Sequence, residues 1–329
     1  MDWILVISRA VEASIGTEAV IYALAAIGLN VHFGYTGLLN FGQAAFLAIG
    51  AYSIATTVTT FGLPFFLGVT IGLALSVVLA LLMGIPTLRL RADYLAIVTI
   101  AAAEIIRLVV RSVALQDVFG GTDGIQAFSG GFYALNPYPE GDYNIGPIIG
   151  FDENTMWVLT VGWILVALSC GLIYLLMKSP WGRVLKAIRE DEDAVRSLGK
   201  NVFSYKMQSL VLGGVIGALA GFIFALSRSA VQPESYNTEL TFYAYTVLIL
   251  GGTARILGPV VGAAIFWGLL ILVGTFLEEA VNTGTITFIT TTQVGPIRYM
   301  LVGLGLMLLL IYRPQGIFGD KREIALDAR

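Results

Sequence analysis

Residues 65–85 read FFLGVTIGLALSVVLALLMGI, without one charged side chain. A helix needs about 20 predominantly apolar residues to cross the hydrocarbon core of a bilayer, and this run has that length. The whole chain of 329 residues is 57% hydrophobic and only 12% charged. Soluble domains are about 45–50% apolar and about 25% charged. The sequence therefore predicts an all-α polytopic membrane protein.

Further apolar runs follow one another along the chain. We expect membrane spans near residues 18–34, 40–60, 64–86, 93–115, 154–177, 206–228, 240–254, 258–277 and 296–313. The segment 240–254 is short for a full crossing, which predicts a half-helix or a tilted piece. We therefore expect about 8–10 transmembrane helices, including broken or half-helices, in a single domain over residues 1–329.

The charged residues between the spans predict the topology, because cytoplasmic loops carry an excess of Lys and Arg. The loop at about 178–205 contains Lys178, Arg183, Lys186, Arg189, Arg196 and Lys200. Further basic residues are Arg89, Arg91, Arg313, Lys321 and Arg322. The loop at about 116–153 contains acidic residues and no Lys or Arg. We expect the first loop and the C-terminus in the cytoplasm and the second loop outside.

Several classes of chemistry are not expected. The sequence has no Walker A pattern, one cysteine (Cys170) and one histidine (His32). We find no nucleophile–base pair and no cluster of metal-ligand type, so we expect neither catalytic residues nor a metal site on this chain. A membrane protein of this kind forms a path, performs chemistry within the bilayer, or holds partners together. A path is the hypothesis that the polar residues favour.

Polar residues interrupt one span, in GYTGLLNFGQAAFLAIGAY at 34–52. If the chain is helical from Thr36 onward, Thr36, Asn40 and Gln43 fall at i, i+4 and i+7, on one face. One interpretation is that this face lines a substrate path. The other is that it packs against another helix, since Asn and Gln hydrogen-bond across helix interfaces.

Ionisable residues interrupt the span AEIIRLVVR at 103–111. Glu104 and Arg107 are i, i+3 neighbours that can pair, and Arg111 follows one turn later. An ionisable residue inside a membrane predicts a functional site because it is costly to leave unpaired. A mutually neutralised structural pair is the alternative, with Arg111 reaching the outer interface.

Glycines interrupt a third segment, LILGGTARILGPVVGAAIFWG at 248–268. Two short helices that meet at a glycine-rich turn are typical of transport proteins. The turn would comprise Gly251, Gly252, Gly258 and Pro259. The alternative is an ordinary tight cytoplasmic turn anchored by Arg255. Elsewhere Gly213, Gly217 and Gly221 recur at four-residue spacing, which predicts close helix packing.

The loop segment WGRVLKAIREDEDAVRSLG at 181–199 has a patchy apolar face among charges of both signs. A short amphipathic helix of this kind can dock into a groove on a soluble partner or lie on a lipid surface. The acidic run EDED favours a protein partner, since anionic lipid would repel it.

Six stretches together resemble one known family. They are GYTGLLNFGQAAFLAIGAY, LRADYLAIVTIAAAEIIRLV (90–109), GGTDGI (120–125), SPWGRVLKAIREDEDAVRSLGKNV (179–202), GGTARILGPVVGA (251–263) and YRPQGIFG (312–319). They are similar, in the same order, to the Liv-type permeases of ATP-binding-cassette importers, which take up branched-chain amino acids and, in relatives, urea or short amides. The resemblance covers about residues 18–319 and is greater to the M-type permease than to the H-type.

The resemblance implies a multi-subunit importer in the cell membrane. This chain would pair with a second permease in a heterodimer, with two cytoplasmic ATPase subunits and an extracytoplasmic substrate-binding protein. ATP and Mg would be bound by the ATPase subunits, so no cofactor and no nucleic acid is expected on this chain. The implied ATPase-coupling residues are Trp181, Gly182, Arg183, Leu185, Ile188, Arg189, Glu190 and Gly199.

The substrate path is expected along Thr36, Asn40, Gln43, Glu104 and Arg107. A permease for urea or short amides is the alternative within the family, and a self-sufficient secondary transporter using Glu104 is the alternative outside it.

Two features depart from the family. Relatives often have histidine where this chain has Gln43, which cannot titrate near neutral pH and so argues against a proton-linked role. Many relatives have GxGT before the Gly-Pro turn, where this chain has Thr253, Ala254 and Arg255. The loss of a glycine there puts a borrowed role for that turn in doubt.

Overall fold

The computed structural model describes residues 2–88, 92–145, 149–286, 289–313 and 315–319. Four of the basic residues used for topology, Arg89, Arg91, Lys321 and Arg322, lie outside these ranges. The long helices are α1 (Trp3–Ile15), α2 (Thr17–Leu29), α3 (Gln43–Thr59), α4 (Phe65–Thr87), α5 (Ala92–Arg111), α8 (Glu153–Lys178), α11 (Val202–Arg228), α12 (Thr238–Gly251), α13 (Gly258–Asn282) and α14 (Thr291–Tyr312).

The prediction of an all-α polytopic membrane protein is confirmed, since the described residues contain six helices that are long and apolar enough to span a membrane. They are Trp3–Tyr35, Phe65–Thr87, Glu153–Lys178, Val202–Arg228, Gly258–Asn282 and Thr291–Tyr312. The other predicted spans coincide with α3, α5 and α12. With 14 residues, α12 is about 21 Å long, shorter than the ~30 Å hydrocarbon core. The expectation that this span is short is therefore confirmed.

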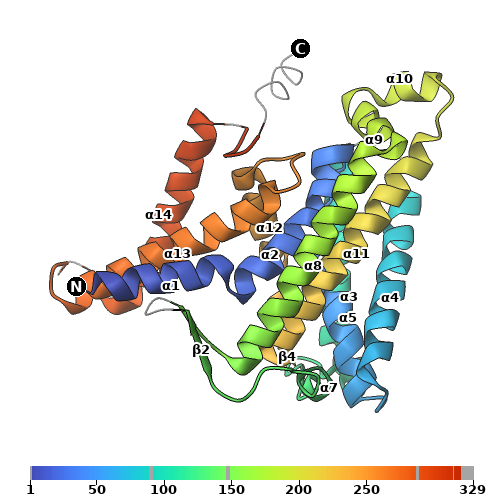
Figure 1. Ribbon diagram of the computed structural model, residues 1–329. Coiled ribbons are helices and arrows are strands. Elements are labelled where there is room, and N and C mark those ends of the chain that lie inside the picture. The colour runs from blue at the N-terminus through green and yellow to red at the C-terminus, as the bar shows by residue number, and fades with distance from the viewer. Residues whose placement is uncertain (1, 89–91, 146–148, 287–288, 314, 320–329) are drawn as a thin grey trace.

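The centre of the bundle is α2, whose residues from Ala19 to Leu29 are all buried. Helix α11 packs against α2, α3 and α4, and these helices run side by side in Figure 1. The glycine stripe makes this contact close. A Cβ atom added at Gly213 would overlap the His32 ring, and one at Gly221 would overlap the Leu47 carbonyl. The predicted packing role of the glycines is confirmed.

The two loops predicted on opposite sides lie at opposite ends of the bundle (Figure 1). One end carries α9 (Pro180–Glu190) and α10 (Glu192–Ser197). The other carries the short elements η2 (Val113–Leu115), α6 (Gln116–Phe119), β1 (Ile125–Gln126), α7 (Gly130–Tyr133), β2 (Asp142–Ile145), β3 (Ile149–Asp152), β4 (Ala230–Val231) and η3 (Pro233–Tyr236). Strand β1 pairs antiparallel with β4, and β2 pairs antiparallel with β3.

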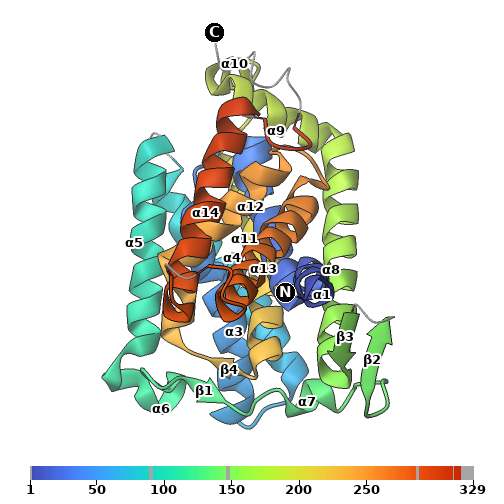
Figure 2. The ribbon, with the colours of Figure 1, turned by 90° about the vertical axis from the view of Figure 1, so that its left-hand side faces the viewer.

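Helices α1, α13 and α14 extend from one flank of the bundle (Figure 1). Helix α1 packs along α13, and α13 in turn contacts α2, α12 and α14. Figure 2 shows α14 in front of α12 and α13, with α5 and α8 at the two edges of the molecule. Only Val294 and Val302 of α14 are buried among its described side chains. Most of this apolar helix therefore faces outward, as expected for a surface in contact with lipid or another membrane subunit.

Candidate functional site

The helix is broken between α2 and α3. Residues Asn30–Tyr35 form the π-helix η1, and regular helix resumes at Gln43. Gly37 adopts a φ of +73°, a left-handed conformation that glycine tolerates best. The chain is therefore not helical from Thr36 through Gln43, so the condition under which Thr36, Asn40 and Gln43 share one helical face is not met. The backbone of Leu38 instead turns back and donates to the His32 carbonyl at 2.8 Å.

The three side chains of the predicted polar face are nevertheless all buried. Thr36 Oγ1 donates to the Val31 carbonyl at 2.8 Å and lies 2.7 Å from Ser209 Oγ on α11. Asn40 Nδ2 lies 3.0 Å from His32 Nδ1. The contact between Thr36 and Ser209 joins the broken segment to α11, as the packing interpretation describes, whereas the contacts with Val31 and His32 lie within the broken segment itself.

Gln43 differs from its two neighbours. Its Nε2 is 3.4 Å from the carbonyl oxygens of both Ala25 and Gly213, and its Oε1 is buried without a hydrogen-bond partner among the described residues. An unpaired buried oxygen costs about 1–3 kcal/mol. The amide is thus placed at the crossing of α2, α3 and α11 without being well satisfied there. Lining of a substrate path by Thr36, Asn40 and Gln43 stays a prediction.

The glycine-rich turn between α12 and α13 is clamped to the π-helix. Asn30 Oδ1 accepts from the Ala254 N–H, and Asn30 Nδ2 donates to the Arg255 carbonyl, both at 2.8 Å. Ala254 itself has a φ of +57°, so a residue with a Cβ occupies a left-handed position. The C-terminal segment closes the turn from the other side. Ile317 N–H donates to the Leu250 carbonyl at 2.9 Å.

The interpretation of this turn as a junction of two short helices is wrong for α13, which has 25 residues. The two helices instead form a tight antiparallel hairpin. A Cβ at Gly251 would overlap the Gly258 carbonyl, and one at Gly262 would overlap the Val247 carbonyl. Gly252 has a φ of +111°, and Pro259 stands in the first turn of α13, where its missing N–H is not needed. A functional role for Gly251, Gly252, Gly258 and Pro259 stays a prediction.

The predicted pairing of Glu104 with Arg107 is confirmed. Arg107 Nη2 lies 2.5 Å from Glu104 Oε1, and Arg107 Nε donates to Glu104 Oε2 at 2.9 Å. The structure adds Glu234 of η3, whose oxygens lie 3.0 Å from Arg107 and 2.9 Å from Arg111. Two acids thus neutralise two arginines where α5 meets the end of the bundle that carries β1 and β4. Participation of this network in a path stays a prediction.

The element formed by α9 and α10 is folded back onto the bundle. Leu185 is completely buried, and Ile188 packs with Val195 and Val202. Their own chain thus covers Leu185 and Ile188, so these two side chains are not exposed to a groove on an ATPase. A role of this element in ATPase coupling stays a prediction. Gly182 allows this close return, since a Cβ there would lie 2.5 Å from the Met177 Cα.

Other residues of this element face outward. Arg183, Glu190 and Gly199 are exposed, and Leu198 is 80% exposed. Leu198 was not among the residues that the sequence suggested, because a single leucine in a charged segment carries no periodic signal. Trp181 Nε1 donates to Gln208 Oε1 at 2.7 Å, and Arg189 Nη1 donates to the Gly34 carbonyl at 2.6 Å.

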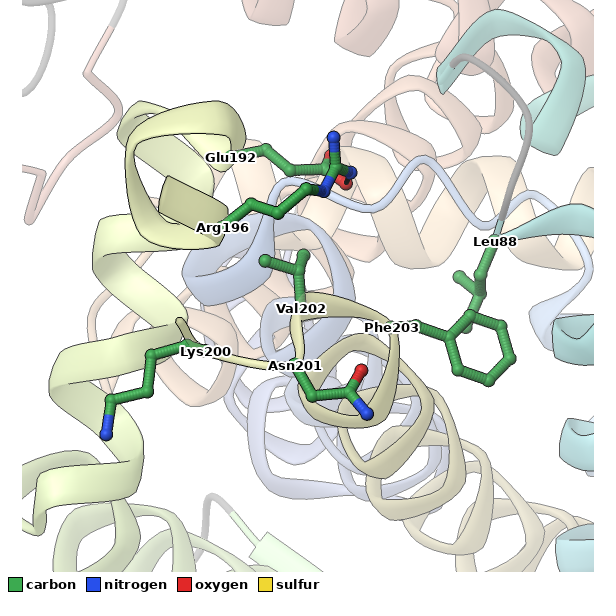
Figure 3. Close-up of a pocket in the computed structure, with 7 residues that line it drawn as sticks. All are labelled: Leu88, Glu192, Arg196, Lys200, Asn201, Val202 and Phe203. Carbon is green, nitrogen blue, oxygen red and sulfur yellow. Dashed lines mark hydrogen bonds and ion pairs between the residues drawn. The ribbon is translucent and has the colours of Figure 1, made fainter. Parts of the chain in front are cut away.

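A cavity of about 490 Å³ lies beside this element, between the end of α4 and the start of α11. Figure 3 shows its seven lining residues, Leu88, Glu192, Arg196, Lys200, Asn201, Val202 and Phe203. Arg196 forms ion pairs of 2.8 Å with Glu192 and Asp193 on its own helix. Lys206 also contacts Glu192. The contact between Lys206 and Glu192 therefore joins α10 to α11.

The packed bundle, the helix broken at its centre and the folded element at one end define the chain as a multi-pass helical membrane protein. The chain belongs to the family described as "Branched-chain amino acid transport system / permease component", which it matches over residues 13–312. Family membership and fold agree with the expectation from the six motifs.

Individual relatives agree with this assignment. The chain is 31% identical to the high-affinity branched-chain amino acid transport system permease protein LivM of Escherichia coli, over 96% of this chain and 71% of that protein. It is 26% identical to the probable LivM of Methanocaldococcus jannaschii, over 92% and 91%. Identity to the probable LivH of that organism is 23%, over 96% of each chain. The greater similarity to LivM confirms the M-type prediction.

Proposed function

We propose that this chain forms one half of the transmembrane path of an ATP-driven importer for branched-chain amino acids. The observation that carries the proposal is the match to LivM of Escherichia coli over 96% of this chain. All 329 residues serve as one permease domain, and the C-terminus and α9–α10 lie in the cytoplasm of the cell that contains the complex.

Other subunits supply the remaining functions of the transporter complex. A second permease of the same family completes the path, and an extracytoplasmic binding protein delivers the amino acid. Two cytoplasmic ATPase subunits bind ATP and Mg, since no nucleotide motif occurs in this chain. Catalysis thus occurs in trans, and this chain contributes the conformational change that ATP hydrolysis drives.

The contacts support a route for that change. An ATPase that pushes on the exposed side of α9–α10 moves Arg189, which is bonded to Gly34 in the broken segment. Asn30 of the same π-helix holds the α12–α13 turn. A displacement at the cytoplasmic surface therefore reaches both irregular segments of the bundle, where Asn40 and Gln43 are buried.

The test is uptake by the reconstituted complex of both permeases, both ATPases and the binding protein in liposomes. Radiolabelled leucine, isoleucine and valine should accumulate only with Mg-ATP inside and loaded binding protein outside. A non-hydrolysable ATP analogue should abolish uptake. Uptake that proceeds without ATP would make the chain a secondary transporter, and preferential uptake of urea or acetamide would replace the substrate assignment.

A further inference from the structure

A second cavity lies at the end of the bundle opposite to α9–α10. Its volume is about 330 Å³, and its lining residues are Glu18, Tyr22, Phe224, Arg228, Glu234, Ser235, Asn237, Glu239, Leu240, Tyr243 and Trp267. Helix α11 begins after the cytoplasmic element and ends at Arg228 in this cavity, so the cavity is on the outer side of the proposed topology. Small-molecule sites range from about 300 to 1,000 Å³, so this one suits a single small solute.

The lining carries both signs of charge on separate elements. Arg228 forms an ion pair of 2.8 Å with Glu18, and its guanidinium lies 4.2 Å from the centre of the Phe224 ring. Only Nη2 of Arg228 serves that ion pair, and a guanidinium has five N–H donors. Glu239 on α12 accepts from the Tyr243 hydroxyl through Oε1 at 2.7 Å. Donors for an anion and an acceptor for a cation therefore line one cavity.

An aromatic wall completes the cavity. The Tyr22 ring is 5.1 Å from the Trp267 ring and 6.2 Å from the Tyr243 ring, measured between centroids. Trp267 Nε1 is buried and has no hydrogen-bond partner in the described part of the chain. A buried indole N–H normally finds an acceptor. The rings of Tyr22 and Trp267 therefore supply the apolar part of the lining.

Glu234 connects this cavity to the ion-pair network of α5. It lines the cavity and also pairs with Arg107 and Arg111. Two of the residues predicted for the path, Glu104 and Arg107, thus lie in a network that ends at the cavity rim. A solute that binds next to Glu234 would therefore change the electrostatic environment of Arg107 and Arg111 on α5, because these arginines already pair with Glu234.

We propose that this cavity is an outward-facing binding site for a zwitterionic amino acid with an apolar side chain. Arg228 holds the carboxylate, because a guanidinium can form two parallel hydrogen bonds to a carboxylate. Glu239 holds the ammonium group, and Tyr22 and Trp267 contact the side chain. Urea and simple amides carry neither charge and bind weakly there. The inference rests on the proposed function, whose substrate class it ties to named residues.

The first test measures binding directly, on the intact complex of permeases and ATPases in nanodiscs without ATP or binding protein. Ser235→Cys in a Cys170→Ser background places a thiol in the cavity. L-leucine should protect it from a hydrophilic thiol reagent, whereas urea should not. Isovalerate, which lacks the ammonium group, and isoamylamine, which lacks the carboxylate, should each protect at least about tenfold less well, since each loses a charged hydrogen bond. Equal protection by urea, or none by leucine, would overturn the site.

The second test assigns the two charges. Arg228→Gln should raise the half-protective concentration of leucine about tenfold and should not raise that of isoamylamine, because the variant also frees Glu18 from its ion pair. Glu239→Gln should do the same for leucine and leave isovalerate unchanged. Glu140→Gln, on the outer loop away from the cavity lining, is the matched control and should behave as the parent. Parental leucine protection in both cavity variants would overturn the assignment.

The inference and the proposed function fail in distinguishable ways. If the complex takes up leucine in an ATP-dependent manner but leucine does not protect the cysteine of Ser235→Cys, the proposed binding site is rejected and the proposed importer function is kept. If the parent complex takes up no leucine, the proposed function as an importer of branched-chain amino acids is rejected. If the solute that is transported instead protects the cysteine of Ser235→Cys, the assignment of the cavity to an amino acid is rejected as well. Trp267→Phe, which keeps an aromatic ring and removes the N–H, provides a further variant. Because the phenyl ring still contacts the ligand side chain, protection by leucine, isovalerate and isoamylamine should match the parent. Selective loss of leucine and isovalerate protection would place the Trp267 N–H at the carboxylate and contradict the assignment of Trp267 to the side chain.

Discussion

The guanidinium of Arg189 on α9 donates a hydrogen bond of 2.6 Å to the carbonyl oxygen of Gly34 in the π-helix η1. This bond joins the element formed by α9 and α10 to the broken segment between α2 and α3. Gly37, which follows the π-helix, also lies against the Arg189 side chain. A rigid contact of this kind can transmit a displacement that a flexible loop would absorb.

We predict that Arg189→Gln uncouples the complex. Hydrogen bonds to charged groups contribute about 1.5–3 kcal/mol, so substrate-stimulated ATP hydrolysis should fall about tenfold or more while the subunits still co-purify. Lys178→Gln, at the exposed end of α8, provides the control and should keep normal stimulation. Full stimulation in Arg189→Gln would show that force is transmitted elsewhere.

The ATPase contact should depend on Leu198 and not on Ile188. Leu198 is 80% exposed, so Leu198→Asp should change stability by no more than about 0.5 kcal/mol and yet lower ATPase co-purification. Ile188 is buried at 4% exposure, so Ile188→Asp should destabilise the chain by about 3 kcal/mol or more. Thermal unfolding of each purified variant and quantitative pull-down of the ATPases separate the two effects. Normal assembly with Leu198→Asp would contradict the contact.

The charges on α5 should behave as a coupled set. Glu104→Gln leaves Arg107 with Glu234 as its acidic partner, and because Glu104 is 39% exposed we expect a loss of only about 1 kcal/mol. Glu104→Gln combined with Arg107→Gln should recover part of the expression and transport. A double variant no better than the worse single variant would argue against mutual neutralisation. Intact stability with lost transport would make Glu104 functional.

Asn40 and Gln43 should respond differently to replacement by leucine. Asn40→Leu removes the contact with His32 and the 2.9 Å bond from the Gly42 N–H, so it should lower stability by about 1–3 kcal/mol. Gln43→Leu removes a poorly satisfied amide, so the melting temperature should not fall. If Gln43 lines the path, uptake should nevertheless drop. Normal uptake with an unchanged melting temperature would leave Gln43 as a packing residue alone.

Topology can be checked with single cysteines in a Cys170→Ser background. A cysteine at Asp142, in the β2–β3 hairpin, should react with an impermeant thiol reagent in intact cells. A cysteine at Asp191, between α9 and α10, should react only after the membrane is permeabilised. The opposite labelling pattern would invert the orientation assigned from the basic residues.

The long apolar segments could be predicted closely from the sequence, since hydrocarbon length dictates them. The span expected at 64–86 is α4 at Phe65–Thr87, and the one expected at 154–177 is α8 at Glu153–Lys178. Ion pairs between neighbouring residues of one helix could also be predicted, as for Glu104 and Arg107, which are three residues apart. These features depend only on composition and helical spacing.

Several of the missed features depend on contacts that helical periodicity does not report. Glu234 joins the α5 network from 127 residues away, a distance at which periodicity carries no information. The end of the helix before Asn40 depends on His32, on Thr99, which accepts from the Phe41 N–H, and on Thr241, which accepts from the Ala44 N–H. The apolar face that contains Leu185 and Ile188 is visible in the sequence, but the sequence does not show what packs against it. In the structure, other residues of the same chain cover this face.

The bonds from the C-terminal segment to α12 set an order of events during biosynthesis. Carbonyl groups in the last turn of a helix have no partner within that helix. In α12, Leu250 and Gly251 obtain theirs from the N–H groups of Ile317 and Phe318 at 2.9 and 3.1 Å. The ribosome completes α12 well before these residues emerge, and α14 must be inserted first. The α12–α13 turn, which Asn30 also holds, therefore receives these bonds last, and a nascent chain that stops within α14 leaves the two carbonyl groups without them.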